Sequence, residues 1–165
     1  MNNQEQILIS LAPRHAENIF SGHKKIELRR RSMNVAPGTI VWIYVTLPVG
    51  SIIGQARISE VHKSTPISLW KKFGTVSGLT KSEFLAYLEG LKEGVVLVLE
   101  DARILDTPLS LEKLRRISNG FNPPQFFIRL GEEHPLFETF TDPSQCFKPK
   151  QKIKNAPDEI QGCYQ

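Results

Sequence analysis

Between residues 24 and 61 the sequence predicts three strands in succession, with no helix between them. The segment 24–30 alternates apolar and charged side chains, which is typical of a half-buried strand. The segment 39–46 is β-branched and aromatic and predicts a central strand, and 51–61 predicts a further strand. A doubly wound sheet alternates strands with helices, so this succession argues against that architecture.

Helices are predicted only at the margins of these strands. The further elements expected are a strand at 7–12, a helix from Pro13 to Gly22, helices beginning at Pro66 and after Thr80, a strand at 94–105, a helix at 111–117 and a closing strand within 123–131. Short strands, tight turns and marginal helices favour an α+β fold. In it, about five to six strands form a small mixed β-barrel or a strongly curled sheet with flanking helices.

Several local signals refine these elements. Thr80 and Glu83 form a T-x-x-E capping box, and Ser110 is placed to cap the helix that follows it. Gly54 interrupts its strand, which predicts a bulge or a close approach by another group. The apolar residues at helical spacing in the second half of the chain are assigned to the core: Trp70, Phe73, Phe84, Tyr87 and Leu88.

The length of 165 residues suits one domain, which we assign to residues 1–140. The polar, lysine-rich segment 141–165 is interpreted as a loose C-terminal tail. No apolar run is long enough to span a membrane, and the N-terminal residues lack a hydrophobic signal core. Cys146 and Cys163 have no C-x-x-C spacing and are expected to be reduced. We therefore expect a cytoplasmic protein without a membrane partner.

Positive charge is concentrated in one short stretch. The net charge is +4 and the isoelectric point about 9.1, which alone is too weak to indicate a nucleic-acid partner. Residues 24–31 carry an excess equal to that of the whole chain, from Lys24, Lys25, Arg29, Arg30 and Arg31 against Glu27. The tail adds Lys148, Lys150, Lys152 and Lys154.

Motifs for metal, cofactor or covalent chemistry are missing from the sequence. The four histidines, His15, His23, His62 and His134, are scattered and are interpreted as surface or satisfied residues. There is no G-x-x-x-x-G-K-[ST], G-x-G-x-x-G or G-x-S-x-G motif. No cofactor and no metal site are therefore expected.

The stretch around Glu27 has two interpretations. Ile26 and Leu28 share one face of the predicted strand, so Glu27 and Arg29 are displayed together on the other. They could form an ion-pair ladder on a wetted surface. Alternatively, they belong to a site in which Lys24 and Arg29 hold phosphate. There Glu27 would orient Arg29 or accept from an exocyclic amine. A glycine such as Gly22, before the strand, lets the backbone come close to a ligand.

The segment GHKKIELR, residues 22–29, resembles the G-x-K-x-x-E-x-R signature of ASCH domains, which belong to the PUA-like superfamily. The preceding ILISLAPRHAENIFSG is similar to the strand and helix before that signature. The following TIVWIYVTLPVGSIIGQARISEV is similar to the next pair of barrel strands, including Gly54. The insertion LWKKFGTVSGLTKSEFLAYLEG and the closing PPQFF also look like those of stand-alone microbial members. The resemblance covers roughly residues 7–131.

This resemblance implies a PUA-like β-barrel with helices around it and a cleft beside the first helix and the signature strand. It also implies RNA binding or the reading of a modified base, with Gly22, Lys24, Glu27 and Arg29 filling the signature. Some small ASCH proteins are hydrolases: one group removes an acyl group from a modified cytidine with a lysine, a threonine and a glutamate, and others are ribonucleases. Lys24 matches that lysine. Glu27 stands where the amidohydrolases have threonine, and segment 74–79 holds no clear counterpart of their glutamate.

Aromatic and amide side chains supply further candidates for base recognition. Tyr44 and Trp42 alternate with apolar residues in one strand, so either base stacking or core packing is open to them. Gln125 follows two prolines and carries an amide that can read a base edge or cap the backbone.

We therefore expect a nucleic-acid-binding module, for RNA rather than DNA, that holds a nucleotide or modified base. Lys24, Glu27 and Arg29 would contact the ligand, and Arg30, Arg31 and the tail lysines would add a salt-sensitive field. One alternative is a small hydrolase of a modified nucleoside or RNA, with Lys24 and Glu27 as an acid–base pair. Another is a regulator that senses a small anionic metabolite. No oligomeric state follows from the sequence.

Overall fold

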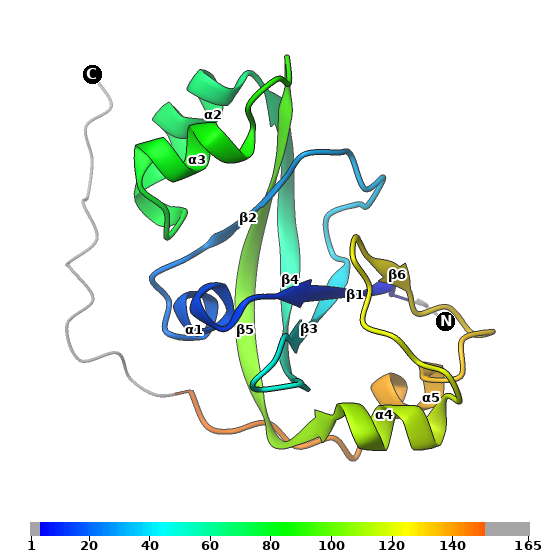
Figure 1. The fold of residues 1–165 in the computed structure, drawn as a ribbon. Coiled ribbons are helices and arrows are strands. Elements are labelled where there is room, and N and C mark those ends of the chain that lie inside the picture. The colour runs from blue at the N-terminus through cyan, green and yellow to red at the C-terminus, as the bar shows by residue number, and fades with distance from the viewer. Residues whose placement is uncertain (1–3, 151–165) are drawn as a thin grey trace.

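The computed structural model describes residues 4–150 and contains one six-stranded sheet (Figure 1). The strands are β1 (Gln6–Leu11), β2 (Ile26–Arg29), β3 (Ile40–Val45), β4 (Ser51–Ser64), β5 (Gly94–Ser110) and β6 (Ile128–Arg129), in the spatial order β2-β5-β4-β3-β1-β6. The pairing of β1 with β3 is parallel, and the other pairs are antiparallel. The expected mixed sheet is confirmed.

Helices flank the sheet as predicted. They are α1 (Pro13–Phe20), α2 (Pro66–Phe73), α3 (Lys81–Tyr87), α4 (Leu111–Ile117) and α5 (Phe137–Thr141), with a short 3₁₀ turn η1 (Gly74–Val76). The Thr80 capping box is present, and the Ser110 side chain caps α4. Among the helices of residues 4–150, η1 and α5 were not expected from the sequence. None of the helices within residues 4–150 combines the length and the apolar character that a membrane span needs.

The long strands β4 and β5 give the sheet its curl, and Figure 1 shows β1 crossing them at a steep angle. Their register shifts near Gly54, and the pairing of β3 with β4 shifts at the same level. A Cβ atom on Gly54 would lie 2.1 Å from the carbonyl oxygen of Arg103, so only glycine permits the two backbones to approach there. Both the bulge and the close approach predicted for Gly54 are confirmed.

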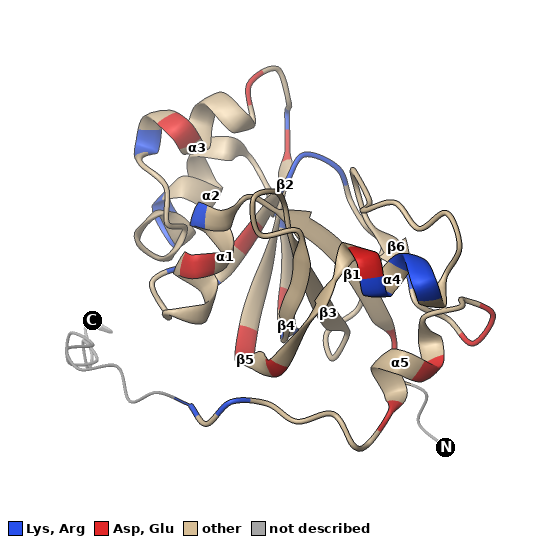
Figure 2. Ribbon diagram, turned by 60° about the horizontal axis from the view of Figure 1, so that its bottom comes forward, with Lys and Arg blue, Asp and Glu red and all other residues tan. Residues whose placement is uncertain are grey.

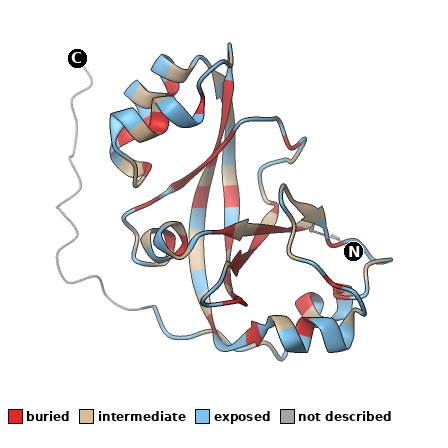
Figure 3. Ribbon diagram, in the orientation of Figure 1, coloured by how far each residue is buried: buried red, intermediate tan, exposed pale blue. Residues whose placement is uncertain are grey.

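The strands β1 and β3 are buried on both faces along most of their length, and Figure 3 shows them mainly in red. Ile9 and Ile43 point into a core under α1, whereas Leu8 and Trp42 point into a second core under α4 and α5. Tyr44 lies in that second core and is 2% exposed, so it is not available for the base stacking considered from the sequence. A third core lies under α2 and α3.

Part of the segment interpreted as a loose tail lies against β5. The amide of Asp106 donates to the carbonyl of Cys146, and the amide of Lys148 donates to that of Ile104. Between them, Phe147 stacks on Trp42 at a centroid distance of 6.3 Å. One aromatic side chain thus anchors a segment whose composition is otherwise polar. Cys163, Lys152 and Lys154 lie outside the described residues.

Candidate functional site

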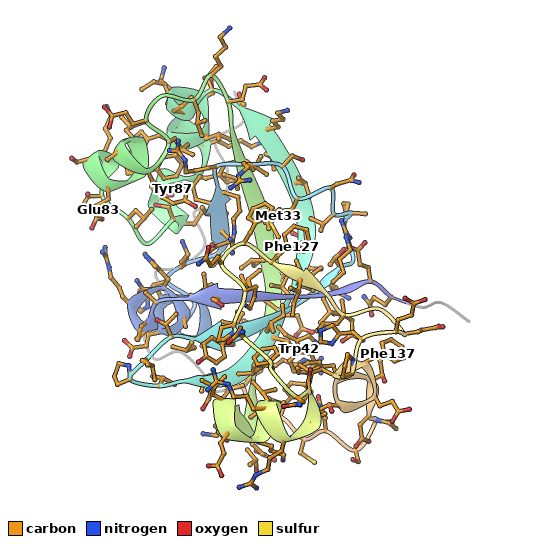
Figure 4. All side chains as sticks on the ribbon, turned by 45° about the vertical axis from the view of Figure 1, so that its right-hand side comes forward. Met33, Trp42, Glu83, Tyr87, Phe127 and Phe137 are labelled. Atoms are coloured by element: carbon orange, nitrogen blue, oxygen red, sulfur yellow. The ribbon has the colours of Figure 1, made fainter. Side chains whose placement is uncertain are left out.

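A cavity of about 420 Å³ opens between β1 and β2, which are not neighbours in the sheet. The end of β1, the first turn of α1, the strand β2, the helix α3 and the loop with Gln125 all line it. Figure 4 shows Glu83 and Tyr87 on α3, beside β2. Lys24, Glu27 and Arg29 of the signature stretch line this cavity together with Gln125, which the sequence singled out separately.

The strand β2 is buried on both faces rather than half-buried. Ile26 and Leu28 belong to the core under α2 and α3, as their spacing predicted. Glu27 and Arg29 are also covered, each 7% exposed, because the cavity walls lie over the face that would otherwise be wet. Glu27 Oε1 lies 3.4 Å from Arg29 Nε, and Glu27 Oε2 lies 3.9 Å from Lys24 Nζ. The pairs are therefore nearly dry and differ from a surface ladder.

Three cations in or next to β2, Lys24, Arg29 and Arg30, donate hydrogen bonds to main-chain carbonyls of different segments around the cavity. Lys24 Nζ donates to Ser77 O at 2.9 Å, and Arg29 Nη1 donates to Phe126 O at 3.1 Å. Arg30 Nη1 donates to the carbonyls of Tyr87 and Glu89 at the end of α3, at 2.6 and 3.2 Å. These three cations thus hold the walls in place, in addition to any role toward a ligand.

Besides Tyr44, two predicted site residues do not line the cavity. Arg30 is exposed and engaged with α3, and Gly22 forms the turn after α1 with a φ of 85°. A φ of that sign favours glycine, so the glycine of the G-x-K-x-x-E-x-R pattern meets a backbone requirement here. Arg31 lies over the ring of Phe126, with 5.3 Å between its Cζ atom and the ring centroid.

The cavity wall carries polar atoms without partners. Within residues 4–150, the buried side-chain nitrogen and oxygen atoms that lack a hydrogen bond are Ser10 Oγ, His15 Nδ1, Arg29 Nε and Arg29 Nη2. All three residues line the cavity. In the same described part of the chain, the carboxylate of Glu27 accepts no hydrogen bond. Since an unpaired buried polar group is costly, a wall of this kind suits a ligand with polar atoms of its own.

The surroundings shift the pKa values of three residues that line the cavity, Lys24, His15 and Glu83. Burial lowers the pKa of Lys24, and the nearby Glu27 carboxylate partly opposes this change. Burial also lowers the pKa of His15, to which the charge of Lys24 contributes, so this imidazole is neutral at pH 7. At the mouth, hydrogen bonds from Arg14 and the Thr80 amide lower the pKa of Glu83 to about 2.

Sequence reasoning missed Ser10, Arg14, His15, Glu83 and Tyr87 as lining residues. His15 was interpreted as a surface or satisfied histidine, Glu83 as a helix cap and Tyr87 as a core residue. Tyr87 is 42% exposed, so the core assignment was wrong and the aromatic ring at the cavity is Tyr87 rather than Tyr44. The available signal was Pro13, which starts a helix directly after β1 and so places its first turn at the strand end.

Comparison with known proteins identifies the relatives of this fold. Residues 7–121 match a family described as a domain of unknown function, DUF365. The chain is 33% identical over 131 residues to a Zymomonas mobilis protein named ASCH domain-containing ribonuclease, covering 79% of this chain and 88% of that protein. This chain belongs to the ASCH family. It is also 28% identical over 109 residues to the ribosomal protein uL22 of Ureaplasma parvum, covering 66% of this chain and 35% of that protein.

Solved ASCH structures have the same fold. The crystal structure of ASCH from Zymomonas mobilis has a TM-score of 0.77 at 30% identity, covering 86% of this chain and 96% of that one. A mutant of the same protein has a TM-score of 0.78 at 29% identity, covering 87% and 100%. The PUA-like fold inferred from the signature is therefore confirmed.

The charged positions of the ASCH signature, Lys24, Glu27 and Arg29, converge on the cavity. The lining also includes Arg14 and Glu83, so cations and carboxylates are mixed there. Helices α3 and α4 also each carry both signs of charge (Figure 2). Within residues 4–150, no group of three or more histidine, cysteine or acidic residues is arranged to hold a metal ion.

Proposed function

We propose that this ASCH protein binds single-stranded RNA and holds one nucleotide in the cavity between β1 and β2. The observation that carries the proposal is the set of unpartnered buried atoms of Ser10, His15 and Arg29, beside the carboxylate of Glu27. A nucleotide offers both acceptors and donors, which such a wall needs. The ribonuclease name of the Zymomonas relative supports RNA as the ligand class.

The size and lining of the cavity favour a single strand. A volume of about 420 Å³ lies within the usual range of small-ligand sites and suits one unpaired nucleotide. RNA is read by sequence mainly where its bases are unstacked, so that their edges are free. Glu27 would accept from an exocyclic amine, Arg29 would donate to a base or phosphate acceptor, and the exposed Gln125 would contact the base edge. Tyr87 offers a ring for stacking.

Fluorescence anisotropy with a labelled single-stranded RNA tests this function. The expected result is saturable binding that is at least about tenfold weaker for a duplex of the same sequence. A matched DNA strand tests the preference for RNA, and a thermal-shift screen with free nucleotides tests the metabolite-sensor alternative. Equal affinity for single strand and duplex would argue against a nucleotide held in the cavity.

A second candidate function is hydrolysis, either of RNA or of a modified nucleoside. It is favoured by Lys24 and His15, two bases with lowered pKa values that line one cavity beside Glu27. Groups shifted in this way suit proton transfer. In the amidohydrolase pattern the glutamate was missing from segment 74–79, but the structure brings Glu83 to the same cavity.

Turnover assays separate catalysis from binding. Labelled RNA and acylated nucleosides are incubated with the wild type and with Glu27→Gln, His15→Ala and His134→Ala. His134 is a matched control because burial lowers its pKa too, although it lies outside the cavity. Product that disappears in the first two variants but not in His134→Ala supports hydrolysis. Binding without any product leaves the RNA-binding function alone.

A further inference from the structure

Arg14 and Glu83 form a two-pronged ion pair at the mouth of the cavity. Arg14 Nη1 donates to Glu83 Oε1 at 2.8 Å, and Arg14 Nη2 donates to Glu83 Oε2 at 3.1 Å. The pair joins α1 to α3, and both residues line the cavity. Their side chains are 55% and 40% exposed, so solvent screens the pair and breaking it costs little.

The two partners depend on the pair to different extents. Glu83 also accepts from the amide of Thr80 at 2.8 Å as the N3 residue of its capping box, where a carboxylate is favourable. Among the residues that the structure describes, Arg14 donates besides Glu83 only to Gly78 O, at a long 3.4 Å. It also lies in the first turn of α1, where the helix dipole disfavours a cation. Glu83 therefore keeps a partner when the pair opens, whereas Arg14 needs another anion.

The surroundings of Arg14 suit such an anion. The N-cap residue of α1, Ala12, lines the cavity and has no side chain that could cap the first turn. Pro13 has no N–H, and the amide of His15 already donates to the carbonyl of Ala12 at 3.0 Å, so within residues 4–150 the first turn offers the amide of Arg14 to an anion. The unpartnered Ser10 Oγ belongs to the same wall. On the facing strand, Arg29 is buried and has two nitrogens without an acceptor. The Arg14 amide at the start of this helix, together with these buried donors, attracts phosphate oxygens.

We propose that Arg14 is a phosphate-binding residue that Glu83 occupies in the free protein, and that a phosphate of the bound RNA displaces the carboxylate. This inference rests on the proposed function, since it names the group that holds the backbone of the RNA. A guanidinium binds carboxylate and phosphate with the same two-pronged geometry. Lys24, Arg29 and Arg30 donate to main-chain carbonyls, whereas Arg14 is held by a side chain that can move away.

Charge-neutral variants test the exchange. In Arg14→Gln, RNA affinity should fall about tenfold, and the slope of log affinity against log salt should decrease by about one. In Glu83→Gln, which can keep the capping box, RNA affinity should rise several-fold. Adding Glu83→Gln to Arg14→Gln should change nothing further, because the residue that Glu83 blocks is gone.

Arg57 and Glu100 provide a matched control. Their guanidinium and carboxylate form a pair at 2.8 Å with side chains 45% and 47% exposed, and neither residue lines the cavity. Arg57→Gln and Glu100→Gln remove the same charges, so any effect shared with them reflects the general field. RNA binding that weakens in Glu83→Gln, or that is equal in Arg14→Gln and Arg57→Gln, would overturn the inference.

Titration with inorganic phosphate keeps this inference separate from the proposed function. Phosphate should shift the NMR signals of the Arg14 backbone amide and Nε group in the wild type, and at lower concentration in Glu83→Gln. This result would support the anion site even if RNA failed to bind. The inference would be overturned if phosphate shifted the Arg14 signals in neither protein, or shifted the signals of the control residue Arg57 at the same concentrations.

Discussion

Arg29 Nε lies 3.4 Å from Glu27 Oε1 and yet has no hydrogen-bond acceptor within residues 4–150. The two side chains, 8% and 9% exposed, balance each other's charge without satisfying each other's hydrogen bonds. In an ion pair optimised for stability, these atoms would form hydrogen bonds with one another. Here both keep hydrogen-bonding capacity for something else at the cavity.

Glu27→Gln should destabilise the folded protein. Glutamine keeps the size of the side chain but leaves Lys24 and Arg29 buried without a countercharge. We expect the free energy of unfolding to fall by about 3 kcal/mol, measured by urea denaturation. Glu100→Gln, in an exposed pair, should cost less than about 1 kcal/mol. Similar losses in both variants would contradict a role for burial.

The free energy of unfolding should change with pH in the alkaline range because of Lys24. Its pKa is lower in the folded protein than the ordinary value of 10.5, so between those two pKa values the unfolded chain binds more protons. The free energy of unfolding should therefore rise with pH across that window. Denaturation of Lys24→Met between neutral and alkaline pH should lack this rise, while Lys25→Met, at an exposed neighbour, should keep it. If the rise in unfolding free energy persists in Lys24→Met, a group other than Lys24 causes it.

Gly54→Ala should disrupt the curl of the sheet. The added Cβ atom would lie 2.1 Å from Arg103 O and 2.9 Å from the ring of Phe20, and the first of these is backbone that cannot swing aside. We expect a loss of more than about 3 kcal/mol in unfolding free energy. Gly131→Ala is the control, because no heavy atom lies within 4 Å of the Cβ position there. Thermal unfolding of both variants measures the difference.

Tyr87→Ala should weaken RNA binding without a large loss of stability, because the ring is 42% exposed. Base stacking on an aromatic side chain contributes about 1–3 kcal/mol, so the affinity should fall by about fivefold or more in anisotropy titrations. Ile117→Ala removes a side chain of comparable exposure, 39%, on α4 and should leave affinity unchanged. Equal effects of the two would show that Tyr87 does not contact the base.

Local patterns were sufficient for the element order and for the signature strand. Pro13, Thr80 and Ser110 mark helix starts that depend only on neighbouring residues, and the structure has all three. The burial of both faces of β2 was not predictable in this way. It depends on α3 and the Gln125 loop, which are distant in sequence and supply the second cover.

The missed site residues have a common reason. Arg14 and Glu83 are 69 positions apart and meet only because α1 and α3 lie on opposite sides of one opening. Each already had a sufficient local explanation, as a residue of a proline-started helix and as a helix cap. Tyr44 shows the opposite case, since its alternation in β3 was compatible with either face and the second core decided between them.

Lys24, Arg29 and Arg30 are each held by hydrogen bonds to main-chain carbonyls rather than to side chains. The main-chain carbonyl group is the same in every amino acid. These hydrogen bonds therefore do not depend on which side chains the wall residues carry, and they do not involve the side chains of Ser77, Tyr87 and Phe126. The buried hydroxyl of Ser77 has a separate structural role, since it donates to the carbonyl of Gly74 at 2.7 Å. A change of side chain at a cavity wall thus alters the lining without removing the main-chain acceptor that holds the basic stretch in place.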